Sequence, residues 1–273
     1  LQLQGQTAAL GWYAFRTALQ AFKRRELLRI GLRDLGEFAR EDVLLRELAH
    51  LADAIVRVVY ERVVEDLAAK HGEPSAAEGL APALCVYAMG KHGSEELNFS
   101  SDVDLVFVYG CEGETEGAAD AEGRRVRRIS NHQFFTTAAA RIVETVNEPW
   151  EGRRLYRVDT RLRPDGAAGP LAISFAAFAA YLERQGRTFE QVAWLRSRCI
   201  AGPEELAARF DEVIRTVVVR AEGRGALAQE VAALKRRIDH ELLSPEDRTR
   251  DIKRGTGGIR EIEFIVALHQ LAH

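Results

Sequence analysis

The spacing of apolar residues changes twice along this chain, and these changes predict which segments form helices and which form strands. Up to about Lys70 apolar residues recur at helical spacing, and no proline occurs before Pro74. Residues 103–109 (VDLVFVY) are instead rich in β-branched and aromatic side chains, which favours a buried strand. After Pro170 the helical spacing returns. The sequence therefore predicts an α+β chain with a small sheet between two helical regions.

Residues 71–79 contain glycine and proline and lack large apolar side chains, which marks a domain boundary. We expect an N-terminal helical region over 1–79, a sheet-bearing domain over 80–169 and a C-terminal helical region over 170–273. Because the chain begins with Leu1 and has Met89 as its one methionine, we expect a fragment of a longer protein. The patterns predict strands over 83–88, 103–109 and 155–163, and later helices over 131–147, 175–184, 188–199, 203–220, 227–242 and 259–273.

Composition excludes several classes of protein. Of 273 residues, 47% are hydrophobic and 29% charged, which is typical of a globular chain, and the net charge of -3 argues against a nucleic-acid binder. The three cysteines, Cys85, Cys111 and Cys199, are far apart and odd in number. They predict neither a disulfide framework nor a zinc site, and favour a reducing compartment. The longest uncharged apolar stretch, 167–182, is too short to span a membrane.

Two aspartates near the start of the second predicted strand are the first candidates for chemistry. Asp102 and Asp104 are two residues apart, and alternate residues of a strand share a face. Neighbouring carboxylates repel each other unless a cation lies between them, and hard oxygen ligands suit Mg²⁺. A pair of exposed aspartates without a metal is the alternative.

Gly93 and Ser94 precede these aspartates. Glycine lets a backbone approach a phosphate closely, and serine adds a hydroxyl and an N–H group. The turn is therefore a candidate phosphate site beside the metal. Together with Asp102 and Asp104 it resembles the pattern of the nucleotidyltransferase superfamily related to DNA polymerase β.

That superfamily has a third carboxylate on a neighbouring strand, and residues 155–163 offer one. Their alternation predicts one charged face made of Arg157, Asp159, Arg161 and Arg163. Asp159 would serve as the third ligand while the arginines neutralise phosphate oxygens. The alternative is a solvent-facing strand with cross-strand ion pairs. In that case Glu96 is the next candidate ligand.

A glycine-rich turn near the end of the chain precedes the last predicted helix. Lys253, together with the free N–H groups at that helix start, forms a candidate anion site. Glu261 and Glu263 either reach the site or interact with the helix dipole, and both interpretations stay open.

Three long motifs now carry a family resemblance. Residues 89–105 (MGKHGSEELNFSSDVDL), 156–164 (YRVDTRLRP) and 257–264 (GGIREIEF) resemble, in order, motifs of glutamine synthetase adenylyltransferase/adenylyl-removing enzymes. The resemblance extends from Phe22 to the end of the chain. Two positions depart from the family turn, which usually has leucine and a second glycine where this chain has His92 and Ser94.

The resemblance implies a polymerase-β-like nucleotidyltransferase core in a cytoplasmic, ATP-binding enzyme of nitrogen metabolism. It implies that Asp102, Asp104 and Asp159 act in catalysis and hold Mg²⁺. The implied residues for nucleotide and phosphate are Gly93, Ser94, Arg161, Arg163 and Lys253. The implied partners are glutamine synthetase, ATP or ADP, phosphate and a nitrogen-signalling regulatory protein.

The family has two nucleotidyltransferase halves, which remove and add AMP on glutamine synthetase. Asn98, residues 169–171 and residues 260–264 resemble the N-terminal half, which removes AMP by phosphorolysis to give ADP. Residues 164–169 are closer to the half that adenylylates with ATP. A regulatory nucleotide-binding module without turnover is the third hypothesis, although clustered carboxylates have little use in such a module.

Overall fold

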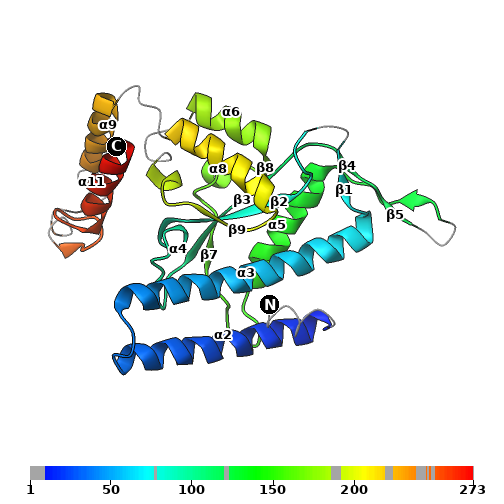
Figure 1. The fold of residues 1–273 in the computed structure, drawn as a ribbon, viewed down its shortest axis with the longest axis horizontal. Coiled ribbons are helices and arrows are strands. Elements are labelled where there is room, and N and C mark those ends of the chain that lie inside the picture. The colour runs from blue at the N-terminus through cyan, green and yellow to red at the C-terminus, as the bar shows by residue number, and fades with distance from the viewer. Residues whose placement is uncertain are drawn as a thin grey trace. The chain divides into compact units, whose positions relative to one another are not determined.

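The structure is a computed structural model that describes residues 10–76, 79–119, 123–185, 192–218, 224–237, 244, 246 and 250–272 (Figure 1). The chain divides into two compact units. The first consists of Leu1–Ala180 and Arg196–Phe210, and the second of Tyr181–Leu195 and Asp211–His273. The sheet and all predicted site residues except Lys253 belong to the first unit.

A small mixed sheet forms the centre of the first unit. Within the described residues it has five strands: β2 (Leu84–Met89), β3 (Val103–Tyr109), β7 (Val158–Asp159), β8 (Ala172–Ser174) and β9 (Arg198–Ala201). Strand β2 pairs antiparallel with β3 on one side and with β9 on the other. Strands β7 and β8 follow one another along the free edge of β3, both parallel to it. The predicted α+β class with a small mixed sheet is confirmed.

Helices α3 (Glu41–His71) and α5 (Asn131–Asn147) pack against one face of the sheet, and α2 (Trp12–Leu35) packs against α3 on the side away from the sheet. The long helical region predicted up to Lys70 consists of two helices, because α2 ends at Leu35 and α3 begins at Glu41. Helix α5 has the predicted bounds, and its N-cap is Ser130, whose hydroxyl accepts a hydrogen bond from the Gln133 backbone N–H.

The opposite face of the sheet is covered by the first turns of two further helices, α6 (Phe175–Gln185) and α8 (Glu204–Val218). Tyr87 of β2 donates its hydroxyl to the Ala207 carbonyl, and its ring lies 6.3 Å from that of Phe210. Because both faces are covered, every residue of β2 is buried. Such burial explains why residues 84–89 form a continuous apolar run without alternation.

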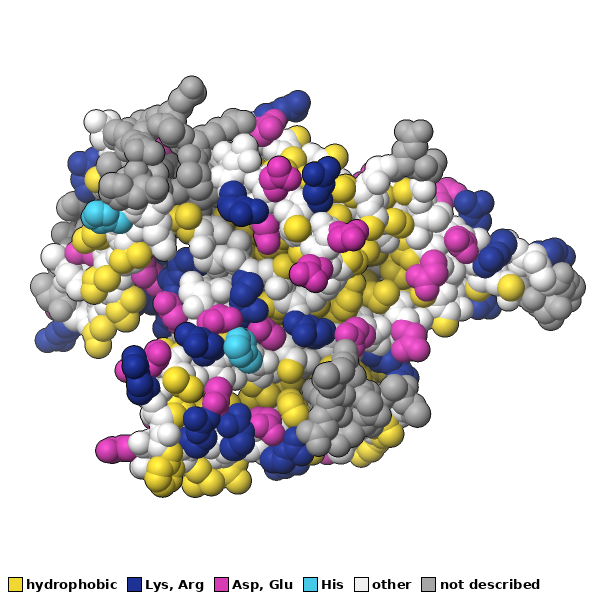
Figure 2. Space-filling model, viewed as in Figure 1, with side chains coloured by type: hydrophobic (Ala, Val, Ile, Leu, Met, Phe, Trp, Pro, Cys, Tyr) yellow, Lys and Arg dark blue, Asp and Glu magenta, His cyan; other side chains and the backbone are white. Residues whose placement is uncertain are grey.

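Short elements complete the first unit. They are α4 (Gly90–Gly93), the 3₁₀ turn η1 (Gly166–Ala168), and two small two-stranded antiparallel sheets, β1 (Pro74–Ser75) with β4 (Glu114–Thr115) and β5 (Ala118–Ala119) with β6 (Arg125–Val126). On the face shown in Figure 2, positive and negative side chains of the described residues are interspersed.

Two predicted elements differ from the structure. The strand expected over 155–163 is reduced to β7, because the backbone turns after Asp159 and becomes left-handed at Asp165 and Gly166. The helix expected over 188–199 is wrong at its end: Arg198 and Cys199 belong to β9, where pairing with buried β2 outweighs local helix propensity. Residues 186–191 lie outside the described residues.

The second unit contains helices α9 (Arg224–Arg237) and α11 (Ile259–Ala272), which pack against each other. Lys235 on α9 pairs with Glu261 on α11 at 2.9 Å. Both helices were predicted, although residues 238–242 of the first lie outside the described part of the chain. No helix in the described residues is long and apolar enough to cross a bilayer.

Candidate active site

Asp104 and Asp159 lie side by side on adjacent strands. Strands β3 and β7 pair in parallel with Val103 opposite Val158 and Asp104 opposite Asp159. Neighbouring strands are about 4.8 Å apart, and paired residues project from the same face. Both aspartates are half-buried. The structure therefore brings together two carboxylates that are far apart in the sequence.

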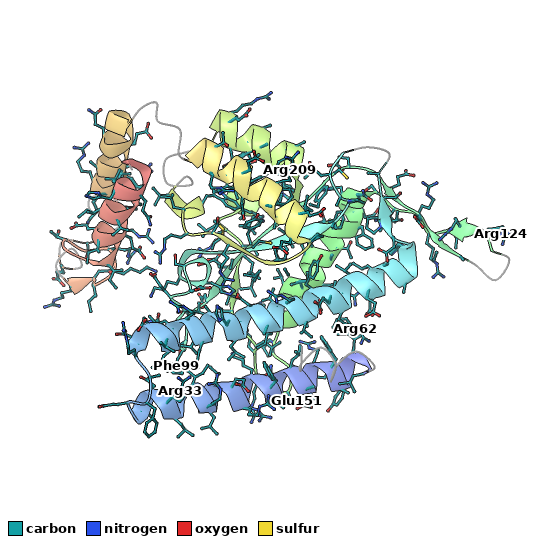
Figure 3. The ribbon with its side chains drawn as sticks, viewed as in Figure 1. Arg33, Arg62, Phe99, Arg124, Glu151 and Arg209 are labelled. Atoms are coloured by element: carbon teal, nitrogen blue, oxygen red, sulfur yellow. The ribbon has the colours of Figure 1, made fainter. Side chains whose placement is uncertain are left out.

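Asp102 lies one residue before β3 and is exposed. Its carboxylate accepts a hydrogen bond from the Arg157 guanidinium, which also donates to the Ser100 carbonyl at 3.2 Å. Phe99, in the same loop, lies beside Gly31 of α2 (Figure 3). Asp102 and Asp104 both lie at the start of β3, and Arg157, the residue before β7, holds the Asp102 carboxylate.

Arg161 holds the carboxylate of Asp159. Its guanidinium Nε donates to both carboxylate oxygens, at 3.0 and 2.9 Å, and its backbone N–H donates at 2.8 Å. These hydrogen bonds lower the pKa of Asp159 below its usual value, so the side chain stays ionised. The Arg161 side chain itself is exposed and accessible to an anion.

Arg163 lies in a different environment. Its guanidinium donates to the Thr160 carbonyl at 2.8 Å and to the Gly169 carbonyl at 3.2 Å. Because β7 ends at Asp159, Arg163 does not continue the strand face that carries Asp159. In this structure it holds together the loop between β7 and β8.

The carboxylates suit a divalent cation by their chemistry. Carboxylate oxygens are the ligands that Mg²⁺ prefers, and Asp104 and Asp159 present two of them at one edge. In the described residues, no three His, Cys, Asp or Glu side chains are grouped closely enough to enclose a metal. Asp102 is directed to Arg157 and Asp159 to Arg161. These carboxylates are therefore of the ligand type that Mg²⁺ prefers, and a metal ion would compete with Arg157 and Arg161 for two of them.

The turn between β2 and β3 lies next to Asp104. Gly90 begins this turn with φ +58°, and a Cβ at that position would be 3.1 Å from the Asp104 carboxylate. A Cβ at Gly93 would overlap the carbonyl oxygens of Ala88 and Arg196, so glycine is required there by close backbone packing. The Ser94 hydroxyl accepts a hydrogen bond from the Arg196 guanidinium at 2.8 Å.

Residues 12–213 match the family model described as glutamate-ammonia ligase adenylyltransferase. The chain belongs to this family. Residues 225–273 match a second model, described as GlnD PII-uridylyltransferase.

Three curated relatives are named bifunctional glutamine synthetase adenylyltransferase/adenylyl-removing enzyme. The proteins from Hahella chejuensis and Thioalkalivibrio sulfidiphilus are 36% and 38% identical over 253 and 254 residues, which is 93% of this chain and 25% of each relative. The protein from Bordetella pertussis is 37% identical over 270 residues, 94% of this chain and 28% of the relative. The chain thus spans about a quarter of the length of these relatives. The family resemblance seen in the sequence is confirmed.

Several polar residues of this adenylyltransferase-family chain were missed by sequence reasoning. Arg196 binds Ser94 and also Glu96, at 2.6 Å, but it lies in a segment that was predicted to be helical. Asp53 binds His92 at 2.8 Å, and the one sequence signal for it was an acidic residue on an otherwise apolar face of a helix. Lys253 belongs to the second unit, where its backbone N–H donates to Asp251.

Proposed function

We propose that this chain removes AMP from an adenylylated tyrosine of glutamine synthetase by phosphorolysis, releasing ADP. The observation that carries the proposal is the paired placement of Asp104 and Asp159, in a chain whose family members modify glutamine synthetase. The resemblance of residues 260–264 to the N-terminal half of the family supports removal rather than addition.

In this reaction an oxygen of inorganic phosphate attacks the phosphorus of the tyrosyl-bound AMP. A new P–O bond forms to give ADP, and the bond between that phosphorus and the tyrosine oxygen breaks. The tyrosine oxygen leaves and takes up a proton. No covalent intermediate with the protein is needed, so positioning and charge stabilisation provide the catalysis.

The site residues have distinct proposed roles. Asp104 and Asp159, joined by Asp102, would hold Mg²⁺, which when bound neutralises charge on the transferred phosphoryl group. Arg161 is exposed and would bind phosphate oxygens once Asp159 is engaged elsewhere. Ser94 would orient a phosphate oxygen through its hydroxyl, whose position Arg196 fixes. Lys253 stays a proposed anion-binding residue of the second unit.

The test is an assay with two arms. Adenylylated glutamine synthetase is incubated with the chain, Mg²⁺ and phosphate, and unmodified glutamine synthetase is incubated with the chain, Mg²⁺ and ATP. Our proposal expects phosphate-dependent ADP in the first arm that disappears when EDTA is added. Pyrophosphate in the second arm alone would establish the adding direction instead. Nucleotide binding without turnover in either arm would establish a regulatory module.

A further inference from the structure

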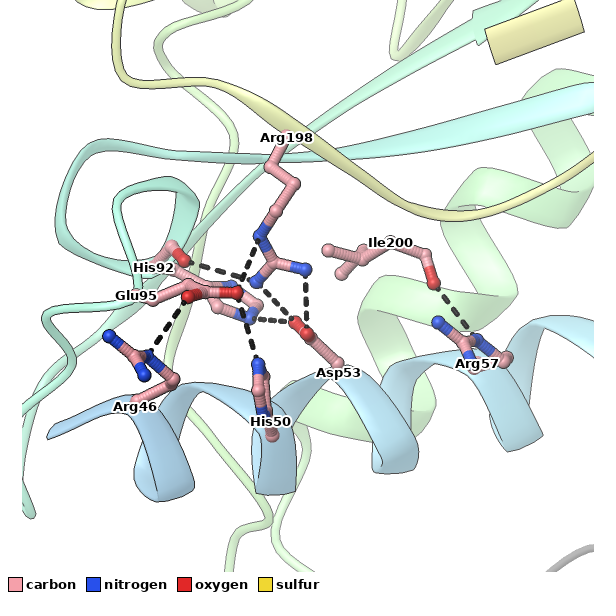
Figure 4. A network of polar contacts seen from close by, with 8 residues as sticks. All are labelled: Arg46, His50, Asp53, Arg57, His92, Glu95, Arg198 and Ile200. Carbon is pink, nitrogen blue, oxygen red and sulfur yellow. Dashed lines mark hydrogen bonds and ion pairs between the residues drawn. The ribbon is translucent and has the colours of Figure 1, made fainter. Parts of the chain in front are cut away.

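The turn that carries Gly93 and Ser94 is anchored by a buried ionic network which the proposed chemistry does not use (Figure 4). At its centre is Asp53, which is buried in the middle of α3. Asp53 accepts a hydrogen bond from His92 Nε2 at 2.8 Å. It also accepts two from Arg198 of β9, at 2.8 and 3.1 Å. One carboxylate thus joins a helix, the turn and an edge strand.

The ionised form of Asp53 is stabilised by its hydrogen-bond partners. Burial alone would raise the pKa of this carboxyl, but the hydrogen bonds from His92 and Arg198 outweigh that effect and lower it. A bidentate guanidinium contact also fixes the orientation of the carboxylate. Asp53 is therefore an ionised and rigid anchor. One helical turn further along, Arg57 donates to the Ile200 carbonyl and ties β9 to the same helix.

A second layer of contacts lies toward the surface. Glu95 of the turn pairs with His50 at 3.0 Å and with Arg46 at 3.4 Å, both on α3. The same carboxylate lies 3.7 Å from Arg198. Together with the Asp53 network, these contacts hold the turn between α3 and β9 on two sides.

The position of this turn matters for the reacting groups. His92 is two residues after Gly90, which lies against the Asp104 carboxylate, and two residues before Ser94. On the side of β9, Gly93 packs against the backbone at Arg196 without room for a side chain. A shift of the turn would therefore alter the distance between Ser94 and Asp104.

We propose that Asp53 is a positioning residue of the active site, which sets the distance between the phosphate-binding turn and Asp104 by holding His92 and Arg198. This inference rests on the proposed function, because it assigns the turn to nucleotide binding. Asp53 is buried and bound to His92 and Arg198, so the role assigned to it acts through these two residues. Its removal is expected to weaken nucleotide binding rather than only to reduce the amount of folded protein.

The key variant is Asp53→Asn, which keeps the shape of the side chain and removes its charge. The matched control is Asp66→Asn on the same helix. Asp66 also accepts hydrogen bonds from basic side chains, Arg62 and Arg141, and a further one from the Trp12 indole N–H at 2.6 Å, but none of these partners belongs to the turn. Each variant removes a carboxylate charge of α3 that binds arginine, so a general loss of stability would appear in both.

Two measurements are made on each folded variant of the full chain. Calorimetric titration gives the dissociation constant of Mg-ADP, the nucleotide product of the proposed reaction, and hydrogen–deuterium exchange gives the protection of the amides of residues 90–96. We expect Asp53→Asn to raise the dissociation constant roughly 10–100-fold, as loss of supporting contacts around a site typically does. We also expect faster exchange in the turn. Asp66→Asn should leave both measurements near wild type.

Equal effects of the two variants on Mg-ADP affinity, or unchanged exchange in the turn of Asp53→Asn, would overturn the inference. If the wild-type chain does not bind Mg-ADP, the nucleotide-binding role of the turn fails, and exchange alone decides whether Asp53 positions it. If Asp53→Asn does not fold, Arg198→Lys replaces it. That variant keeps the charge but loses the bidentate contact, and we expect the same two changes at smaller size.

Discussion

Asp104 and Asp159 are partners in a parallel β-ladder, although 54 residues separate them in the sequence. Two carboxylates at this spacing repel each other unless positive charge lies nearby. The structure supplies that charge through Arg161, which binds Asp159 directly. In the proposed activity a metal ion takes over this role, which frees Arg161 to bind phosphate oxygens.

Asp159→Ala and Arg161→Ala should affect different steps. Loss of Asp159 removes a proposed metal ligand, so turnover should fall at least about 100-fold and the Mg²⁺ requirement should rise. Loss of Arg161 removes an exposed guanidinium, so the Michaelis constant for phosphate should rise about 3–10-fold at an unchanged Mg²⁺ requirement. Separate titrations of Mg²⁺ and phosphate distinguish the two. An unchanged Mg²⁺ dependence in Asp159→Ala would assign the ligand role to another residue, with Glu96 next.

The pH dependence of activity should also change in Arg161→Ala. Arg161 lowers the pKa of Asp159 by hydrogen bonding to its carboxylate, so without Arg161 that pKa rises toward its ordinary value. Asp159 would then become protonated at a higher pH as the solution is acidified. The acidic limb of the rate profile should therefore move to higher pH. An unmoved acidic limb would mean that ionisation of Asp159 does not limit the rate.

Arg163→Ala should act on stability. Arg163 donates to the carbonyls of Thr160 and Gly169, and its loss leaves these groups without a charged donor. The expected cost is about 1–3 kcal/mol in the free energy of unfolding, measured with urea, while phosphate affinity stays near wild type. The opposite outcome, intact stability with weakened phosphate binding, would restore the role that the strand pattern suggested for Arg163.

Lys23→Met tests a half-buried lysine that contacts the segment just before β7. Lys23 donates to the Leu155 carbonyl, and its ammonium lies 4.0 Å from the ring of Tyr156. Burial lowers the pKa of Lys23 from 10.5 to about 8. Between about pH 8 and pH 10.5 the unfolded chain therefore holds a proton that the folded chain has released, so this residue makes stability rise with pH.

In Lys23→Met that contribution disappears. Urea unfolding of both proteins at several values between pH 7.5 and about 10 should show a steeper rise in stability for the wild type. Parallel curves would show that Lys23 keeps its charge on folding, compensated by the Leu155 carbonyl and the Tyr156 ring.

The sequence predicts those elements whose pattern is local. Residues 103–109 form a strand with the predicted bounds because β-branched and aromatic side chains fill a doubly covered sheet. Helix α5 was equally predictable, since Ser130 caps it and Pro149 follows it. By contrast, β9 is decided by its pairing with β2, which local spacing does not encode.

The sequence proposes members for the candidate site but does not predict their contacts. Asp102, Asp104 and Asp159 were identified from spacing and family resemblance, and the register of β3 and β7 places two of them together. The alternation of arginines around Asp159 suggested one continuous face, but β7 ends at Asp159 and the chain turns, so Arg163 binds loop carbonyls instead. The link from Asp53 to His92 joins residues 39 apart, so no local pattern indicated it.

The rate of nucleotidyl transfer by wild type and Asp104→Asn, measured side by side, tests the central claim most directly. ADP release is followed from adenylylated glutamine synthetase with phosphate and Mg²⁺, and thermal unfolding is recorded for both proteins. We predict a fall of at least about 100-fold with an unchanged unfolding temperature, because asparagine keeps the shape of aspartate but is a poor Mg²⁺ ligand. A substituted protein that releases ADP at the wild-type rate would contradict the assignment of this carboxylate pair as the centre of the chemistry.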